Sequence, residues 1–300
     1  MIKVGIIGTG FIGPAHIEAL RRLGFVEVVA LCDASQEQAE EKARALGVPY
    51  AYASPDALLA HPGLQVVHNC TPNHLHADIN RQVLRAGKHL FSEKPLCMTV
   101  AEAEELTALA QAAGVVHGVS FVYRQFAMVQ QAASLRRAGK LGRQFSVYGS
   151  YLQDWMALET DYNWRVDAAV GGVSRAIADI GSHWCDTVQF VTGRRITGVM
   201  ADLAIVWPTR KASTTGSATF GAGQPPQHHE DKAVTTEDAG SVLLRFDDGS
   251  TGCFSVSQVS AWRKNRPRFE LTRSECSLGC DQASPLPLWI GHLQQATQLP

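Results

Sequence analysis

The 300-residue sequence has no excess of charge of either sign and no long hydrophobic run. Lysine and arginine total 27 against 28 aspartate and glutamate residues, so no basic surface is expected to bind nucleic acid or an anionic membrane. No apolar stretch approaches the ~20 residues that span a bilayer, and the first apolar run, residues 4–7, begins too early to follow a signal peptide. We therefore expect a cytoplasmic protein whose partners include neither nucleic acid nor a membrane.

The sequence also lacks a cysteine or histidine pattern suited to a metal. Its seven cysteines are scattered, mostly inside apolar strand or helix patterns, which indicates reduced thiols in the core. Cys276 and Cys280 form the only close pair, and without a second ligand pair two strand residues are favoured over a zinc site. His228 and His229 lie within residues 208–238, a segment rich in Thr, Ser, Gly, Pro and charge that we interpret as a flexible insertion. No metal is predicted.

What the sequence does contain is 45% hydrophobic residues, enough for a large core and more naturally for two domains. Up to residue 121, short β-branched runs alternate with longer helical patterns, which is typical of a parallel sheet wrapped by helices. We predict an α/β fold with an N-terminal, doubly wound Rossmann domain over residues 1–121. Its strands are expected at residues 3–7, 26–32, 50–53, 66–70, 89–92 and 115–121.

A glycine-rich motif, Gly8-Thr-Gly10-Phe11-Ile12-Gly13, directly follows the first predicted strand and opens a helix. In this context Gly8 permits the tight turn, Gly10 lets a pyrophosphate approach the backbone, and Gly13 lets the helix pack on the strand. Taken without its context, the same pattern is also found in glycine-rich turns that bind nothing. The position after a strand favours dinucleotide binding, to which Phe11 and Ile12 would contribute.

Asp33 ends the second predicted strand, twenty residues after Gly13. A carboxylate there accepts hydrogen bonds from both ribose hydroxyls and repels a 2′-phosphate, and neither Ala34 nor Ser35 is an arginine that would reverse this preference. We therefore predict NAD as the cofactor, with NADP disfavoured. The alternative, that Asp33 simply caps the next helix, is compatible with the same position.

A polar segment follows the fourth predicted strand, at the edge where open parallel sheets bind their ligands. Its candidates for cofactor contact are Thr71, Pro72, Asn73 and His76. Asn73 also stands where a helix cap belongs, and for His76 an ordinary place on the helix surface is favoured over a catalytic role.

Glu93-Lys94-Pro95 ends the fifth predicted strand at the same edge of the sheet. There Lys94 can hold a substrate oxygen by a charge-assisted hydrogen bond, and Pro95 can fix the turn through a cis peptide bond. Glu93 and Lys94 are placed close to the nicotinamide. The alternative is a solvated ion pair at a strand end.

Asp179 and His183 are four residues apart in residues 174–192, whose apolar residues follow a helical period. On one helix face, the carboxylate can orient the imidazole and stabilise the imidazolium that forms when it takes a proton from a substrate hydroxyl. An isolated pair of this kind is more often structural. Gly171-Gly172 and Gly181 allow close approach of backbone to a ligand, which favours a site.

The ordered set of the glycine motif, Glu93-Lys94-Pro95 and Asp179-x-Gly-x-His183 resembles the Gfo/Idh/MocA oxidoreductase family over most of the chain. Members combine a Rossmann domain with an α+β domain whose open sheet is largely antiparallel. They oxidise or reduce sugars, sugar derivatives and cyclitols with NAD or NADP. The resemblance implies that Lys94, Asp179 and His183 form the catalytic set, with His183 transferring the proton.

The resemblance further implies that Tyr123-Arg124 and Trp164-Arg165 lie near the cofactor or the substrate. It implies a homodimer or homotetramer formed through the sheet of the second domain, residues 122–300. In this domain the pattern itself predicts a helix to about residue 138, strands at 145–152, 196–206, 240–246 and 251–259, and a hairpin turn at Asp247-Asp-Gly249.

Two departures from the family lie near the C-terminus. Members usually continue past the sheet with a further helix and a closing segment, whereas this sequence ends at Pro300. Residues 272–280 also lack the glycine-bearing turn expected there. The second domain is therefore interpreted as C-terminally short relative to the family.

The expected substrate site combines aromatic and polar side chains in two clusters. Tyr151, Gln153, Asp154 and Trp155 end one strand, and Asp161-Tyr-Asn-Trp-Arg165 follows. Aromatic faces pack on the C–H face of a sugar or cyclitol ring while amide, carboxylate and guanidinium groups bond its hydroxyls. A phosphorylated sugar fits less well because the aspartates would repel it unless Arg124 or Arg165 serves the phosphate.

The leading hypothesis is thus an NAD-dependent dehydrogenase acting on a secondary alcohol of a sugar, a sugar derivative or a cyclitol. One alternative is redox-assisted, NAD-dependent glycoside cleavage. A third hypothesis is a catalytically inactive dinucleotide-binding homologue, which the short C-terminus favours and the presence of Lys94, Asp179 and His183 disfavours.

Overall fold

The computed structural model describes residues 1–214 and 229–292 of the chain. The chain divides into two compact units, each described by itself below. The first comprises Met1–Ser120 and Ala169–Gly172, and the second comprises Phe121–Ala168 and Val173–Pro300.

The first unit is built on a six-stranded, wholly parallel sheet in the order β3-β2-β1-β4-β5-β6. This is the doubly wound order in which ligands bind at the carboxyl edge, where the chain reverses direction across the sheet. The predicted Rossmann fold is confirmed. The strands are β1 (Ile2–Ile7), β2 (Val26–Cys32), β3 (Tyr50–Tyr52), β4 (Val66–Asn69), β5 (His89–Ser92) and β6 (His117–Val119).

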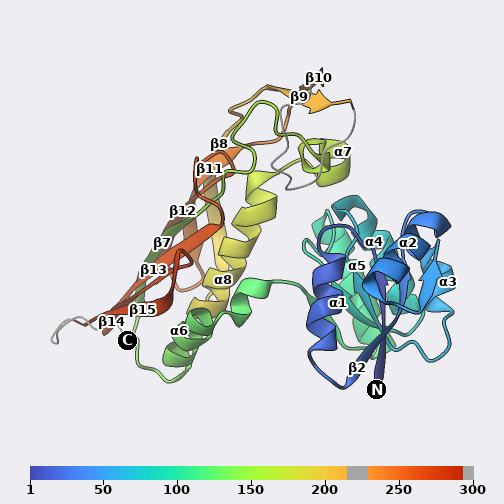
Figure 1. Ribbon diagram of the computed structural model, residues 1–300. Helices are drawn as coiled ribbons and strands as arrows, with labels where there is room; N and C mark the ends of the chain where they lie inside the picture. Colours follow the sequence, from blue (N-terminus) through green and yellow to red (C-terminus); the bar gives the residue numbers. More distant parts are fainter. Residues whose placement is uncertain (215–228, 293–300) are drawn as a thin grey trace. The chain divides into compact units, whose positions relative to one another are not determined.

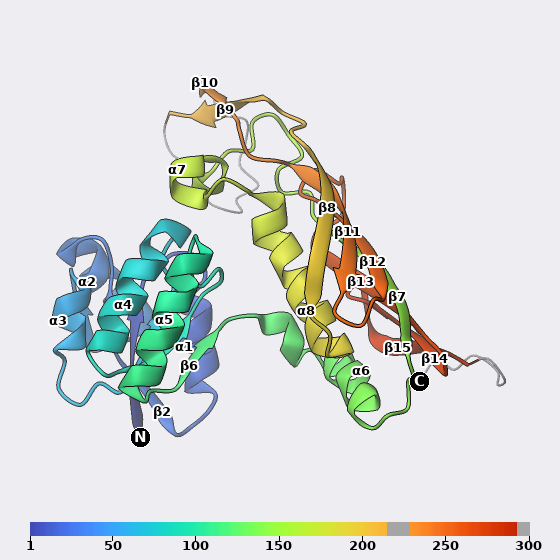
Figure 2. The same ribbon diagram turned by 180° about the vertical axis from the view of Figure 1, so that it is seen from behind.

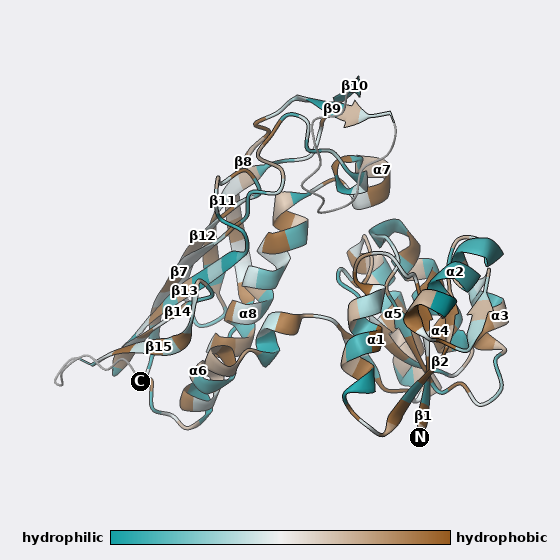
Figure 3. Cartoon of the chain, viewed as in Figure 1, coloured by the Kyte–Doolittle hydropathy of each residue, from teal (hydrophilic) through white to brown (hydrophobic). Residues whose placement is uncertain are grey.

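Helices cover this sheet on both faces (Figures 1 and 2). Adjacent residues of β1 point to opposite faces of the sheet. Ile7 packs in the hydrophobic cluster on one face and Ile6 in the cluster on the other, and both are almost completely buried. Figure 3 shows the matching distribution of colour, hydrophobic on β1 and β2 and largely hydrophilic on α2. The helices are α1 (Gly13–Arg21), α2 (Gln36–Leu46), α3 (Pro55–Leu59), α4 (His76–Arg85) and α5 (Val100–Ala113), with a 3₁₀ turn η1 (Asn73–Leu75) before α4.

Local signals in the sequence fix where several of these helices begin and end. Thr99 and Glu102 form the capping box of α5, each side chain bonding the other's backbone N–H, and Gly114 ends the helix in the left-handed conformation. The Ser54 hydroxyl caps α3 by accepting from Ala57 N.

The second unit contains a seven-stranded sheet in the order β15-β14-β13-β7-β12-β11-β8. All neighbouring pairs are antiparallel except β12 with β7, which confirms a largely antiparallel sheet. Its strands are β7 (Gln144–Leu152), β8 (Ile196–Ala204), β11 (Ala239–Phe246), β12 (Thr251–Ser257), β13 (Arg266–Arg273), β14 (Cys276–Asp281) and β15 (Ser284–His292). The predicted hairpin turn joins β11 to β12, with Gly249 at a φ of 80°.

Two helices, α6 (Ala127–Arg137) and α8 (Ser182–Thr192), lie along one face of this sheet (Figures 1 and 2). Trp184 of α8 stacks on Phe254 of β12 with ring centroids 4.5 Å apart, at the centre of the unit's core. Shorter helical turns are η2 (Val122–Gln125), η3 (Trp164–Val166) and α7 (Ala168–Gly171). The expectation of one regular helix over residues 174–192 is corrected, because Ile177–Gly181 is a π-helical turn that carries Asp179.

The interpretation of residues 208–238 as a flexible insertion is also wrong in part. β9 (Thr209–Ser213) and β10 (His229–Ala233) pair as an antiparallel two-stranded sheet. Residues 215–228, including His228, lie outside the described residues. His229 is exposed on β10.

Three further observations concern absent or unpaired groups. Within residues 1–214 and 229–292, no helix is long and apolar enough to cross a membrane. The same described residues include no cluster of three or more potential metal ligands. All seven cysteines are free thiols, and Cys276 and Cys280 both lie on β14, as predicted.

Candidate active site

The glycine-rich loop has the geometry that a dinucleotide pyrophosphate needs. Gly8 has a φ of 89°, and a Cβ at Gly13 would lie 2.4 Å from the Gly8 carbonyl oxygen, so neither position accepts a side chain without distortion. A Cβ on Gly10 would meet nothing within 4 Å, which leaves open space beside the loop. No side chain caps the start of α1, so the backbone N–H groups of its first turn, apart from Pro14, which has none, are available to a phosphate.

Asp33 holds this loop from the end of β2. Its Oδ2 accepts from the Thr9 backbone N–H at 3.2 Å and from the Thr9 hydroxyl, and its Oδ1 accepts from Ala34 N at 2.7 Å. The helix-cap alternative is overturned, because Ser35 caps α2 instead. Asp33 therefore joins the loop to the end of the strand where the ribose of a dinucleotide is bound in this fold.

Buried asparagines organise the end of β4, and sequence reasoning missed them. Asn69 and Asn80 are both fully buried, and Asn69 Nδ2 donates to Asn80 Oδ1 at 2.9 Å. Asn69 Oδ1 in turn accepts from the backbone N–H and hydroxyl of Thr71, at 3.2 and 2.7 Å. Asn80 Nδ2 reaches Ser92 Oγ and Leu96 O, both at 3.0 Å, so the ends of β4 and β5 are held together.

The expectation that His76 lies on the helix surface is wrong. Its side chain is buried, and its ring nitrogens lie 2.7 Å from the Thr71 carbonyl oxygen and 2.5 Å from that of Pro95. His76 thus connects the segment after β4 with the segment after β5. Asn73 does not cap a helix with its side chain, since its Nδ2 donates to Gly171 O at 3.0 Å.

The alternative for this motif, a solvated ion pair at a strand end, does not hold for Glu93. Its carboxylate lies 3.0 Å from His16 Nε2, and His16 Nδ1 lies 2.9 Å from His68 Nδ1. Burial would raise the pKa of Glu93, but hydrogen bonds from His16 and Ser120 outweigh it and lower that pKa. Burial and nearby His16 lower the pKa of His68 to about 3, so His68 is neutral at physiological pH. Lys94 follows in a cis peptide bond with Pro95, as the sequence suggested.

In the second unit, His183 sits in an aromatic cage. Its side chain is 8% exposed, and its ring meets those of Tyr123, Phe121 and Tyr151 at centroid distances of 4.9, 5.6 and 6.5 Å. The Tyr123 and Tyr151 hydroxyls are hydrogen-bonded to each other. Burial and the Tyr123 hydroxyl raise the pKa of Tyr151, which therefore stays protonated.

Asn265, which the sequence did not indicate, links the polar groups around this cage. Its Oδ1 accepts from Tyr151 at 2.5 Å and from Gln153 Nε2 at 3.1 Å, and its Nδ2 donates to the Tyr123 hydroxyl at 2.9 Å. Gln153 Oε1 accepts from Trp155 Nε1 at 2.7 Å. The predicted residues Tyr123, Tyr151, Gln153 and Trp155 are thus brought together.

Asp179 belongs to a second polar network. Its Oδ2 accepts from Gln258 Nε2 at 2.9 Å, and Gln258 Oε1 accepts from Arg175 at 3.2 Å. Arg175 and Arg210 both donate to Asp238, and all three side chains are fully buried. Arg210 also donates to the carbonyl oxygens of Met156, Leu158 and Asp161, which fixes the loop after β7.

The two arginines considered for substrate or cofactor binding have different surroundings. Arg124 forms a two-pronged ion pair with Asp186, which raises the pKa of Arg124. The Arg165 guanidinium lies 4.3 Å from the centroid of the Trp164 ring and 6.0 Å from that of Trp155.

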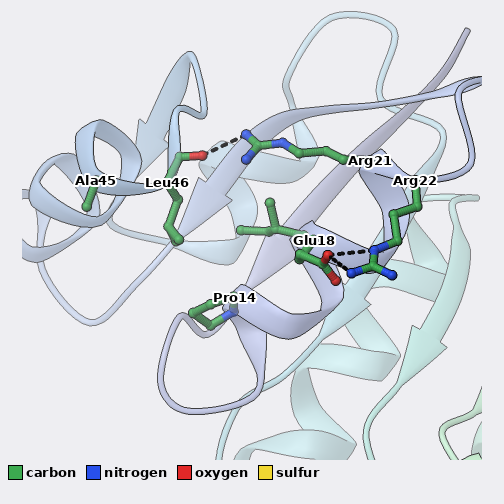
Figure 4. A pocket seen from close by; sticks show the side chains of 7 residues that line it. Pro14, Glu18, Arg21, Arg22, Ala45 and Leu46 are labelled. Carbon is green, nitrogen blue, oxygen red and sulfur yellow. Dashed lines mark hydrogen bonds and ion pairs between the residues drawn. The ribbon is translucent and has the colours of Figure 1, made fainter.

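A separate surface hollow lies between α1 and the end of α2 (Figure 4). The cations around it have acceptors: Arg22 pairs with Glu18, and Arg21 donates to the carbonyl oxygens of Leu46 and Gly47 at 2.6 and 2.9 Å. No predicted site residue lines it.

Comparison with known proteins agrees with this geometry. Residues 2–121 match the family described as "Oxidoreductase family, NAD-binding Rossmann fold", and residues 129–278 match the "GFO/IDH/MocA C-terminal domain". The chain belongs to the Gfo/Idh/MocA oxidoreductase family. Its resemblance to that family, seen first in three short motifs, is confirmed.

Named relatives of this Gfo/Idh/MocA protein act on sugars. It is 32% identical to a levoglucosan dehydrogenase from Pseudarthrobacter phenanthrenivorans over 289 residues, covering 92% of this chain and 73% of the relative. Its fold matches an oxidoreductase domain protein from Kribbella flavida with a TM-score of 0.91 at 32% identity, over all of this chain and 80% of that one. It matches a levoglucosan dehydrogenase in complex with NADH and L-sorbose with a TM-score of 0.89 at 28% identity, also over all of this chain and 80% of that one.

This oxidoreductase belongs to an NAD-binding family. The open space at Gly10 and the uncapped start of α1 fit a pyrophosphate. The residues suited to hold NAD are those of the glycine loop together with Asp33, at the carboxyl edge of the sheet.

Proposed function

We propose that this protein is an NAD-dependent dehydrogenase that oxidises a secondary alcohol of an unphosphorylated sugar derivative or a cyclitol. The observation that carries the proposal is the His183 constellation. A buried imidazole lies in a cage of aromatic rings, and the carboxylate four residues before it is anchored by a buried amide. Relatives that act on levoglucosan or bind L-sorbose support the substrate class.

In this mechanism the imidazole of His183 takes the proton from the reacting hydroxyl oxygen, and Asp179 stabilises the resulting imidazolium. Lys94 Nζ holds the same oxygen by a charge-assisted hydrogen bond and stabilises its developing negative charge. Bound NAD would supply the acceptor for the hydride of the carbinol carbon. The alcohol thus gives the proton of its hydroxyl group to His183 and the hydride of its carbinol carbon to the acceptor, which leaves a ketone.

Binding of the cofactor is assigned to the first unit. We propose that Asp33 accepts hydrogen bonds from the adenosine ribose and so selects NAD over NADP. The backbone around Gly10, Phe11, Ile12 and Gly13 would receive the pyrophosphate. Thr71, Pro72, Asn73 and Glu93 lie at the same carboxyl edge of the sheet and would contact or support the nicotinamide half, as would Trp164 and Arg165 by analogy with the family.

Substrate recognition is assigned to the residues around the His183 cage. Tyr123, Tyr151 and Trp155 offer aromatic faces, and Gln153 offers a polar amide, a combination that suits a neutral ring with hydroxyl groups. A phosphate is disfavoured because Arg124, one of the two cations considered for it, is already committed to Asp186.

The experiment that tests this proposal is a substrate panel with NADH formation as the readout. It contains levoglucosan, unphosphorylated aldoses, glycosides and inositols, with phosphosugars and simple hydroxy acids for comparison. We expect turnover in the first group and recovery of a keto product. Activity confined to phosphosugars or hydroxy acids would refute the substrate class. Cleaved glycosides without net NADH would instead establish redox-assisted glycoside cleavage.

We also propose that the protein is a homodimer or homotetramer formed through the face of the seven-stranded sheet that α6 and α8 leave uncovered. Two large hydrophobic side chains that oppose each other across the outer strands, Met200 of β8 and Leu243 of β11, are exposed on this face. Light scattering at micromolar concentration tests this, and a folded monomer would contradict it.

A further inference from the structure

Gln258 occupies a fully buried position directly after β12, where the backbone is held on both sides. Its backbone N–H donates to Asp238 O and its carbonyl oxygen accepts from Met156 N, both at 3.0 Å. The side chain lies between a cation, Arg175, and a candidate catalytic carboxylate, Asp179. Neither sequence motif nor the mechanism above gives this residue a role.

The chemistry of the two neighbours fixes which way the amide of Gln258 points. A guanidinium has only N–H donors, so the group that faces Arg175 at 3.2 Å must be the amide oxygen. The amide nitrogen then faces Asp179 Oδ2 at 2.9 Å and donates to it. With the opposite orientation the amide N–H groups would meet the guanidinium N–H groups, and the amide oxygen would meet the carboxylate.

Arg175 is itself held in place. Its guanidinium donates to Asp238 and to Thr236 Oγ1, and its side chain is fully buried. Asp238 Oδ2 accepts from the backbone N–H groups of Val206 and Trp207 at 2.7 and 3.1 Å. Glu237 Oε1 accepts from Arg175 N and Ile177 N at 3.0 and 2.9 Å, which fixes the start of the π-helical turn that carries Asp179.

We propose that Gln258 is a positioning residue for Asp179. Arg175 fixes the orientation of the Gln258 amide, and the amide in turn fixes the orientation of the Asp179 carboxylate. The inference rests on the proposed function, because it assigns a partner to Asp179 in proton transfer. A hydrogen bond from Gln258 Nε2 holds Asp179 Oδ2 and favours the ionised form of the carboxylate that stabilises the imidazolium of His183.

The first test replaces Gln258 with an apolar side chain of similar size. For Gln258→Leu we expect kcat to fall by about 10- to 100-fold, because small displacements of a catalytic group have effects of this size. The KM for NAD should stay unchanged. The matched control is Gln144→Leu, since Gln144 is buried in the same sheet at the start of β7 and its amide nitrogen donates to Ser250 Oγ at 2.9 Å. Levoglucosan serves as the probe, or myo-inositol where the panel shows it to be the better substrate.

The second test is the substitution Gln258→Glu. If Gln258 had a purely structural role, the effect of this substitution on kcat should not depend on pH. A protonated glutamic acid can still donate to Asp179, whereas the ionised form repels it. The charged or titratable groups around this position are Arg175, Asp179, Glu237 and Asp238, with Tyr151 electrostatically coupled to Asp179. We expect the ratio of variant to wild-type kcat to fall as the pH rises through the titration of the new carboxyl.

The outcomes separate this inference from the proposed function. If Asp179→Asn loses activity while Gln258→Leu keeps the wild-type kcat, the positioning role is overturned and the proposed function stands. If Asp179→Asn is fully active, the proposed function is wrong and the inference fails with it. Should Gln258→Leu fail to fold, the Gln258→Glu profile decides, and a ratio of kcat values that does not change with pH overturns the inference.

Discussion

The substitution Asp238→Asn tests how the second unit supports the network behind Asp179. Asp238 is the single carboxylate that receives both Arg175 and Arg210, and all three side chains have no exposed surface. The substitution keeps the size of the side chain but leaves two buried guanidinium groups without their counter-charge. Removal of one partner from a buried ion pair typically costs about 3–5 kcal/mol, because the remaining charge has been taken out of water without compensation.

This cost should be visible as a shift in thermal unfolding. For a unit of this size about 1 kcal/mol corresponds to roughly 2–4 °C in Tm, so we expect the transition of the second unit to fall by about 6–20 °C. Scanning calorimetry with and without NAD identifies the two transitions, because NAD raises the Tm of the unit that binds it. Asp78→Asn is the control, since Asp78 is 75% exposed and its pair with Arg81 should contribute only about 0–1 kcal/mol.

The contribution of the Asp238 carboxylate to stability should depend on pH. Burial alone would raise the pKa of Asp238, but hydrogen bonds and charge from Arg175 outweigh it and lower that pKa. A carboxylate with a lowered pKa in the folded state stabilises the protein above its unfolded pKa of about 3.9, and this is lost as the pH falls through the folded pKa. The Asp238→Asn variant should not show this loss of stability on acidification. A variant within about 1 kcal/mol of the wild type would refute the reasoning.

Three further predictions concern the first unit. Gly13→Ala should abolish detectable NADH binding in a fluorescence titration, because its Cβ would lie 2.4 Å from the Gly8 carbonyl oxygen; unchanged affinity would exclude this contact as a constraint. Asp33→Ala should narrow the preference in kcat/KM for NAD over NADP, whereas equal use of both by the unmodified protein would contradict the assignment. His68→Gln should reduce the stability that the protein loses as the pH falls below about 6.5. In the unfolded chain His68 binds a proton near this pH, whereas in the folded protein its pKa is about 3. Melting curves from pH 7 to 5, with exposed His117→Gln as the control, check it, and a parallel loss in both variants would count against it.

The Rossmann half could be predicted well because its signals are local. Alternating apolar runs located all six strands of its sheet. The strands that were missed carry weaker signals. β9 and β10 are short and rich in charged residues, and β15 contains Pro285 and Pro287, which suit an edge strand but interrupt a strand pattern.

The polar networks could not be predicted for a different reason. Arg175, Arg210 and Asp238 are far apart in the sequence and resemble ordinary surface charges until the fold buries them together. The same holds for His16, His68 and Glu93, which come from α1, β4 and the end of β5. The π-helical turn at Asp179 is also invisible to a 3.6-residue period, since it depends on a bond from Ser182 N back to Ile177 O.

The central claim is that His183 transfers the proton in an NAD-dependent oxidation of a secondary alcohol. The most direct test measures kcat of His183→Ala with levoglucosan, or with the best substrate of the panel, beside the dissociation constant for NADH. We expect kcat to fall by about 10²–10⁴-fold while the NADH dissociation constant stays unchanged. A near-normal kcat in this variant would contradict the account and remove His183 from the mechanism.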